Sequence, residues 1–185
     1  MASKPLDIEY KVGSKKELIS ETDMKGVITY ANGDFVELSG YSEDELKGSP
    51  HSILRDIEMP QTVFKLLWES LKSGHDYKAI VRNRRKDGKY YWVYSEYEAI
   101  LDESYRMKGF RSKRYPVPKA VLKEVEDLYI KLLSIEEAKG QKDAEKFLEL
   151  TLHNDGYRDY DLYVEELYNR KIKGFFGMFG SLFSK

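Results

Sequence analysis

The sequence predicts an α+β domain, with helices on one face of an antiparallel sheet, followed by a helical extension. Segments rich in β-branched and aromatic residues fall in two groups, at residues 18–30 and 77–115, and short helical segments lie between them. After residue 116 the apolar residues recur only at helical spacing. Because strands and helices are segregated along the chain, we expect an antiparallel sheet rather than a parallel one.

The first group of strands reads as a hairpin. Residues 18–22 and 27–30 are strand-like, and Asp23-Met24-Lys25-Gly26 between them has the composition of a tight turn. Gly26 can take the positive φ that such a turn requires.

Four helical segments are expected next. Asn32 is a suitable N-cap for a first helix ending at Gly40. Ser42 and Glu45 form a capping box for a second. A third turn is predicted over 51–55, and a longer helix begins at Pro60 and ends at Gly74. Its apolar face consists of Val63, Phe64, Leu67, Trp68 and Leu71.

The second group predicts three longer strands, at 77–85, 90–101 and 105–115. Asp87-Gly88 marks a hairpin between the first two. Counting both groups, the sequence predicts a five-stranded antiparallel sheet.

We divide the chain into four parts: a mobile N-terminal arm over 1–17, a domain over 18–115, a helical extension over 116–173 and a tail over 174–185. Apolar positions over 121–133 predict an exit helix. Ser134-Ile135-Glu136-Glu137 resembles a capping box and predicts a new helix there. The tail holds four of the eight phenylalanines, and its helical pattern favours contact with a partner or a membrane surface.

Composition excludes several functions. The chain has 185 residues and no cysteine, so disulfides, thiolate metal sites, cysteine nucleophiles and photochemistry that forms a cysteine adduct are excluded. With 31 Lys+Arg against 32 Asp+Glu, no strongly basic surface for nucleic acid is indicated. No catalytic motif or metal-ligand spacing is present, which favours a protein that is not an enzyme. There is no signal-peptide pattern and no membrane-spanning run, so we expect a cytoplasmic protein.

The first domain resembles a PAS domain. Within that family it is similar to the sensor of Aer-type aerotaxis (energy-taxis) receptors and their split, membrane-free relatives. The motifs that carry the resemblance are Thr22-Asp23 through Thr29-Tyr30-Ala31-Asn32, Phe35 through Tyr41, Glu45 through His51, Arg55, Met59-Pro60, Trp68, Leu71 through Gly74, Val81 through Gly88, and Tyr91-Trp92-Val93.

The resemblance implies an FAD held between the sheet and its helices, with its redox state read by the protein. It places six candidate cofactor-binding residues around that cavity: Asn32, His51, Arg55, Trp68, Asn83 and Trp92. Arg55 matches an arginine suited to the flavin pyrophosphate. Asn83 suits the polar edge of the flavin ring.

Each candidate also has a structural interpretation. Asn32 is equally well explained as a helix cap, Trp68 as a core residue, and Trp92 as core or outer-face residue. Asp56 or Glu58 could pair with Arg55 internally. The sequence also departs from the usual motif, with Asp56 in place of histidine and Ile57 in place of proline, and a carboxylate close to a phosphate is unfavourable.

Two other functions stay open. One is a haem or gas sensor in which His51 is the iron ligand. The other is a cofactor-free PAS module that only scaffolds a signalling complex. For the leading hypothesis we expect signalling in trans to a membrane chemotaxis transducer, and a homodimer formed through the flanking helices.

Overall fold

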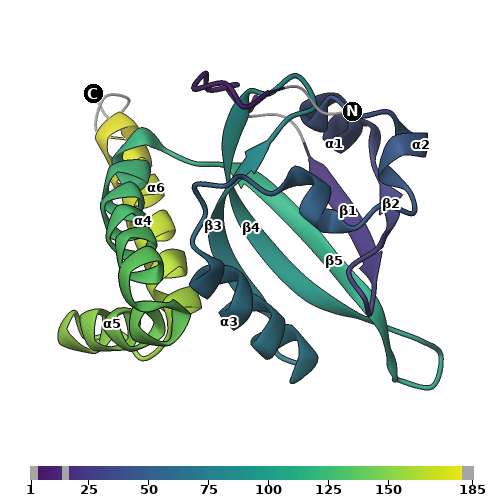
Figure 1. The fold of residues 1–185 in the computed structure, drawn as a ribbon. Helices are drawn as coiled ribbons and strands as arrows, with labels where there is room; N and C mark the ends of the chain where they lie inside the picture. Colours follow the sequence, from purple (N-terminus) through teal and green to yellow (C-terminus); the bar gives the residue numbers. More distant parts are fainter. Residues whose placement is uncertain (1–3, 14–16, 181–185) are drawn as a thin grey trace. The chain divides into compact units, whose positions relative to one another are not determined.

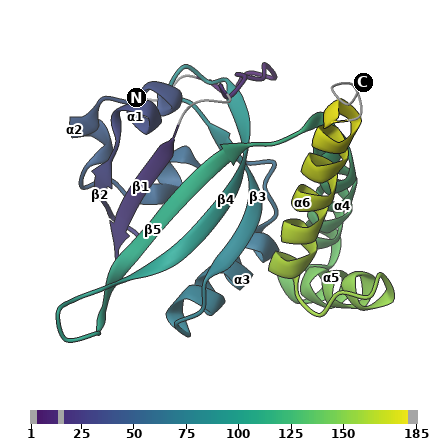
Figure 2. The same ribbon diagram turned by 180° about the vertical axis from the view of Figure 1, so that it is seen from behind.

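The computed structural model describes residues 4–13 and 17–180, with side chains through residue 170. Five strands form one sheet in the order β2-β1-β5-β4-β3, and every neighbouring pair is antiparallel (Figures 1 and 2). The predicted five-stranded antiparallel sheet is confirmed. The strands are β1 (Leu18–Asp23), β2 (Ile28–Ala31), β3 (Tyr77–Arg84), β4 (Tyr90–Leu101) and β5 (Met107–Pro116).

The helical segments between β2 and β3 cover one face of this sheet, as predicted (Figure 1). They are α1 (Gly33–Ser39), α2 (Glu43–Leu46), the 3-10 turn η1 (His51–Leu54) and α3 (Gln61–Lys72). Both predicted caps are present. Asn32 accepts from the Phe35 amide, and Ser42 and Glu45 form a reciprocal capping box.

The sheet presents a mixed apolar and polar surface to these helices. Alternation along β3, β4 and β5 turns Asn83, Tyr91, Ser112 and Arg114 to this inner face, and each is at most 5% exposed. Buried polar groups need partners, so a polar inner face suggests that this side of the sheet does more than pack.

The described chain divides into two compact units. The first comprises residues up to Met59 together with Val63–Pro116 and contains the sheet. The second comprises Pro60–Thr62 and the residues from Val117 onward, with helices α4 (Lys119–Lys139), α5 (Gln141–Asn154) and α6 (Tyr160–Gly180). Its core includes Val125, Leu132, Leu148, Val164 and Leu167.

The helix start predicted at Ser134 is wrong. Helix α4 runs without a break through this residue to Lys139. Between Lys119, where the helix begins, and Ser134 there is no glycine or proline that could interrupt it. Glu136 instead accepts hydrogen bonds from the amides of Gln61 and Thr62, at 3.0 and 2.7 Å, in the same compact unit.

The two ends of the chain are partly described. Residues 4–13 lie along the β3–β4 turn, where the Leu6 amide donates to the Gly88 carbonyl and the Tyr10 amide to that of Tyr90. The mobility predicted for the arm stays a prediction. The α6 backbone is helical to Gly180, but the side chains predicted to contact a partner or membrane lie outside the described residues. No helix in the described ranges is long and apolar enough to cross a membrane.

Two neighbouring positions on α4 test the importance of the core of the second unit. Leu132 is fully buried, whereas Ile130 is 65% exposed. We expect Leu132→Ala to lower the free energy of unfolding by about 2–5 kcal/mol, because it leaves a cavity, and Ile130→Ala to change it by less than about 0.5 kcal/mol. Urea denaturation of the full chain measures both, and equal losses would contradict this assignment of the core.

Candidate ligand-binding cavity

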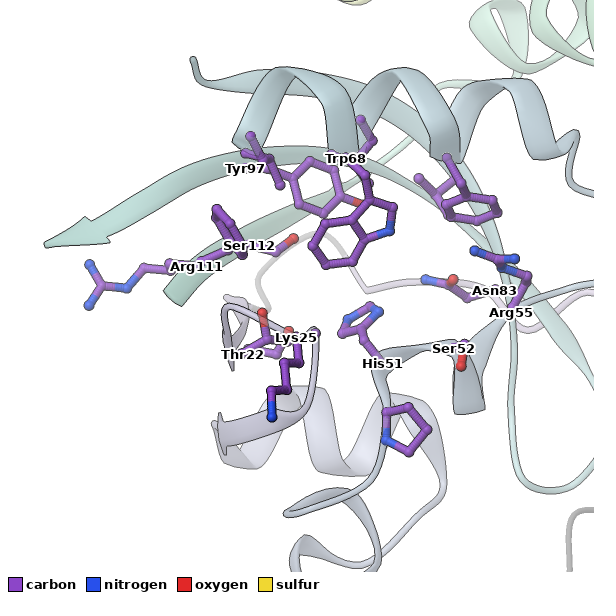
Figure 3. Close-up of a pocket in the computed structure, with 18 residues that line it drawn as sticks. Thr22, Lys25, His51, Ser52, Arg55, Trp68, Asn83, Tyr97, Arg111 and Ser112 are labelled. Atoms are coloured by element: carbon purple, nitrogen blue, oxygen red, sulfur yellow. The ribbon is translucent and has the colours of Figure 1, made fainter. Parts of the chain in front are cut away.

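A cavity of about 260 Å³ lies between the inner face of the sheet, η1 and α3 (Figure 3). Its volume is close to the lower end of the range of about 300–1,000 Å³ that is usual for small-molecule sites. The residues around it are Ser20, Thr22, Lys25, Gly26, Pro50, His51, Ser52, Arg55, Phe64, Leu67, Trp68, Leu71, Val81, Asn83, Tyr97, Phe110, Arg111 and Ser112. None of these described residues is an aspartate or a glutamate.

Trp68 reaches from α3 into the middle of the cavity, opposite His51 (Figure 3). Its ring packs edge-on against Phe110, with 5.7 Å between the ring centroids. On the far side it approaches Gly26, which has φ +80° and where an added Cβ would lie 3.0 Å from the indole. Gly26 therefore serves both the turn and the space for Trp68.

His51 and Arg114 form a buried pair beside the cavity. Arg114 is 1% exposed, and its Nη2 lies 2.8 Å from Nε2 of His51. Because arginine only donates, Nε2 is the acceptor and the neutral ring carries its proton on Nδ1. Both side chains also contact Phe35, with the Arg114 guanidinium 4.5 Å from its ring centroid and His51 stacked at 6.4 Å.

The electrostatics of this pair keep His51 neutral. Burial lowers the pKa of His51 to about 3, and the nearby charges of Arg114 and Arg55 act in the same direction. Burial also lowers the pKa of Arg114, which has no carboxylate partner among the described residues. A positive charge is thus held inside the domain without a counter-charge.

Arg55 is at the opposite end of the cavity from Lys25, next to Asn83 (Figure 3). The side chain is exposed, and its guanidinium lies 4.1 Å from the centroid of the Phe64 ring. No carboxylate of the described chain pairs with it. The internal pairing of Arg55 with Asp56 or Glu58 that the sequence left open is not seen.

Asp56 and Glu58 pair with two other arginines, Arg82 and Arg84. The carboxylate of Asp56 contacts Arg82 Nε at 3.1 Å and Arg84 Nη2 at 2.7 Å, and Glu58 also pairs with Arg82. Arg82 and Arg84 alternate with the cavity residue Asn83 along β3. The carboxylate expected to repel a phosphate is therefore neutralised and is not among the residues that line the cavity.

The structure brings four of the six predicted site residues together. His51, Arg55, Trp68 and Asn83 line one cavity. Asn32 does not line it. Its side chain caps α1 and also accepts from the Ile19 amide, in agreement with the cap interpretation.

Trp92 does not line the cavity either. It lies on β4 between the inward-facing Tyr91 and Val93, so its side chain is on the outer face, where it is 5% exposed. The motif Tyr91-Trp92-Val93 predicts a strand, but it does not show which of its side chains face the cavity. That depends on the strand register, which the sequence does not give.

Sequence reasoning missed Arg114 and the hydroxyls of Ser20 and Ser112. These hydroxyls are buried, lack a hydrogen-bond partner and belong to cross-strand neighbours on β1 and β5. Period-two alternation from Phe110 would have placed Ser112 and Arg114 on the inner face, so a signal was present.

The arrangement suits an anionic ligand. Two basic residues contribute to this, Lys25 and Arg55 among the lining residues, and the buried Arg114 adds a third positive charge next to His51. Arg111 also borders the cavity, but its side chain points away from it and pairs with Glu21 and Glu98 (Figure 3). No group of His, Asp and Glu side chains suited to a metal ion occurs among the described residues.

Comparison with known proteins agrees with this architecture. Residues 28–111 match the family model described as "PAS fold". This part of the chain therefore has the PAS fold, as the sequence motifs predicted.

The chain is also similar in sequence to a bacterial receptor and to a biofilm dispersion protein. It is 39% identical over 112 residues to the aerotaxis receptor of Escherichia coli strain K12. The matched segment covers 60% of this chain and 22% of the receptor. It is 32% identical over 88 residues to the biofilm dispersion protein BdlA of Pseudomonas aeruginosa, covering 47% of this chain and 21% of that protein. The chain thus spans about a fifth of the length of these relatives. The resemblance to the Aer-type sensor is confirmed.

Solved structures show the same fold. One, described as "Flavin Analogue Sheds Light on Light-Oxygen-Voltage Domain Mechanism", superposes with a TM-score of 0.54 at 24% identity, covering 60% of this chain and 88% of that one. At this level of identity the likeness concerns the fold alone.

The neutral state of His51 predicts a pH dependence of stability. Because its pKa is lowered from 6.5 to about 3 in the folded chain, the unfolded chain binds the extra proton between these values. Stability is therefore lost as the pH falls below about 6.5, by up to about 1.4 kcal/mol per pH unit from this residue.

His51→Gln tests this contribution, because the amide oxygen keeps an acceptor for Arg114 but does not titrate. Urea denaturation of the ligand-free chain and the variant at pH 7, 6 and 5 should show the two unfolding free energies converging as the pH falls. Parallel curves would mean that His51 titrates normally.

Proposed function

We propose that this chain is a non-enzymatic, cytoplasmic PAS sensor that binds FAD and reports its redox state to a membrane-bound chemotaxis transducer. The observation that carries the proposal is the cavity itself, which has Arg55 at its boundary and Arg114 next to the lining residue His51. Neither arginine has a carboxylate partner among the described residues, and no described residue that lines the cavity is acidic. Such a site attracts a ligand that carries both a planar ring system and phosphate charge.

The described residues fit a flavin. Asn83 offers an amide donor and acceptor for the polar edge of the ring. The unpaired hydroxyls of Ser20 and Ser112 are further donors and acceptors. Trp68, Phe64 and Phe110 supply aromatic surface, and the exposed guanidinium of Arg55 can bind the diphosphate.

When bound, the flavin supplies reversible uptake of electrons. The chain supplies the electrostatics: Arg114 and Arg55 place positive charge near the cavity, which favours negative charge within it. His51 holds an acceptor towards Arg114 and so fixes the guanidinium. A change of charge in the cavity alters the balance of this hydrogen bond, and Arg114 lies on β5, directly before the chain enters α4.

The recipient of the signal that we propose follows from the relatives. Because a similar protein is named an aerotaxis receptor, we propose a membrane chemotaxis transducer as partner and a homodimer formed by the flanking helices. We also propose that the tail over 174–185 contacts the membrane surface.

An absorption spectrum tests the cofactor directly. We expect the purified full chain, alone or after incubation with FAD, to show flavin bands that bleach on reduction with dithionite. A chain that stays colourless would overturn the proposal and favour a cofactor-free module. A Soret band that is lost in His51→Ala would instead show a haem sensor.

A variant of Arg55 tests the role of the phosphate. Arg55→Ala should weaken FAD binding about tenfold or more, because it removes a charge-assisted hydrogen bond, and should leave riboflavin binding nearly unchanged. Arg106→Ala is the matched control, since Arg106 pairs with Asp102 in the β4–β5 turn and does not line the cavity. Flavin fluorescence titration measures all six affinities, those of the wild type and the two variants for FAD and for riboflavin. Equal losses for FAD and riboflavin would contradict a phosphate contact.

A further inference from the structure

We propose that Asp56 is a positioning residue, which holds Arg55 and Asn83 in place at the cavity through Arg82 and Arg84. The proposal deepens the function above and rests on it only where FAD is the probe. It concerns the residue at which this sequence departs from the usual motif of Aer-type sensors.

Asp56 is fixed by several contacts although it does not touch the cavity. It is 0% exposed. Its Oδ2 accepts from Arg82 Nε at 3.1 Å and contacts Arg84 Nη2 at 2.7 Å, while Oδ1 accepts from the Glu58 amide at 2.9 Å. One buried carboxylate thus binds two strand residues and orders its own turn.

The geometry passes this restraint to the cavity in two ways. On β3, Asn83 stands between Arg82 and Arg84, so both of its neighbours are anchored to the same carboxylate and its side chain is directed to the other face. In addition, Arg55, which directly follows η1, forms an isolated antiparallel β-bridge with Asn83 on β3. Arg55 and Asn83 lie side by side at one end of the cavity (Figure 3).

Asp56 is the buried carboxylate among the partners of these arginines. Arg82 also pairs with Glu58, whose side chain is 55% exposed, and Arg84 donates to the carbonyls of Leu6 and Gly88. The guanidinium of Arg82 stacks 3.7 Å from the centroid of the Tyr90 ring, and that of Arg84 lies 5.8 Å from it. Arg82 is only 8% exposed. Removing the buried carboxylate leaves Arg82 with the exposed Glu58 as its nearest acid and Arg84 with backbone carbonyls alone, so the strand and turn would have to shift to hydrate the guanidinium groups.

A positioning role for Asp56 predicts the opposite change in ligand affinity from a purely electrostatic role. If Asp56 acted only by its charge on a bound phosphate, then neutralising it would tighten binding. If Asp56 positions Arg55 and Asn83, then neutralising it weakens binding, and the loss depends on Arg55.

The experiment compares Asp56→Asn with Glu58→Gln in the full chain. Glu58 carries the same charge, lies two residues away and also pairs with Arg82, but its side chain is 55% exposed. Asp56→Asn should weaken FAD binding by about tenfold, the loss typical when an orienting outer partner is removed from a binding site. Glu58→Gln should change it less than twofold.

A double-variant cycle separates positioning from general damage. In an Arg55→Ala background, Asp56→Asn should cost clearly less FAD affinity than in the wild type, because the guanidinium that it positions is already gone. Tighter FAD binding by Asp56→Asn, or full additivity with Arg55→Ala, would overturn the proposal. Thermal melts monitor folding, and Asp56→Glu, which keeps the charge but misplaces it, should also weaken binding.

A ligand-free measurement keeps this proposal separate from the identity of the cofactor. Amide hydrogen exchange at Arg55 and Asn83 should become faster in Asp56→Asn and stay unchanged in Glu58→Gln, whether or not the chain binds FAD. Absence of FAD binding by the wild type would overturn the proposed function alone. Unchanged exchange at both residues in Asp56→Asn would overturn the positioning role.

Discussion

A positive charge buried without a carboxylate partner is the constraint on which the site depends. Removing an arginine from water is costly, and the cost is normally offset by an acid inside the protein. At Arg114 the offsetting contacts are the Nε2 acceptor of His51 and the face of Phe35. These contacts hold the guanidinium without cancelling its charge, so the charge remains available to a ligand. The same arrangement requires a neutral histidine, which burial secures.

Strand alternation separates two kinds of arginine in this domain. Arg82 and Arg84 share the buried carboxylate of Asp56, and the outer face also carries the Glu21, Arg111 and Glu98 pairs. Arg114, on the inner face, has no carboxylate partner among the residues that the structure describes. Residues one position apart on a strand face opposite sides of the sheet. Arginines of the same strands can therefore form ion pairs on the outer face and carry unpaired charge on the inner face.

The fold was predictable from sequence for local reasons, and the site only in part. Turn and cap residues such as Gly26, Asn32 and Ser42 act within a few positions of the chain, so their patterns sufficed for the order of elements. The failed helix start at Ser134 shows the limit, because a capping-box pattern does not by itself break a helix that nothing else interrupts. The face of Trp92 depended on register, and the partners of Asp56 depended on contacts more than twenty residues apart. Arg114 was within reach of strand alternation, but its pairing with His51 was not.

The cavity also links ligand charge to proton binding. The pKa of His51 is lowered by burial first, and then by the charges of Arg114 and Arg55. An anion bound between Arg114 and Arg55 would oppose the effect of their charges, and so would raise the pKa of His51 from its ligand-free value. Because His51 is the acceptor for Arg114, protonation of Nε2 would end that hydrogen bond and convert it into a repulsive contact. A change of charge in the cavity is therefore coupled to the position of a side chain on β5, the last strand before the helical extension.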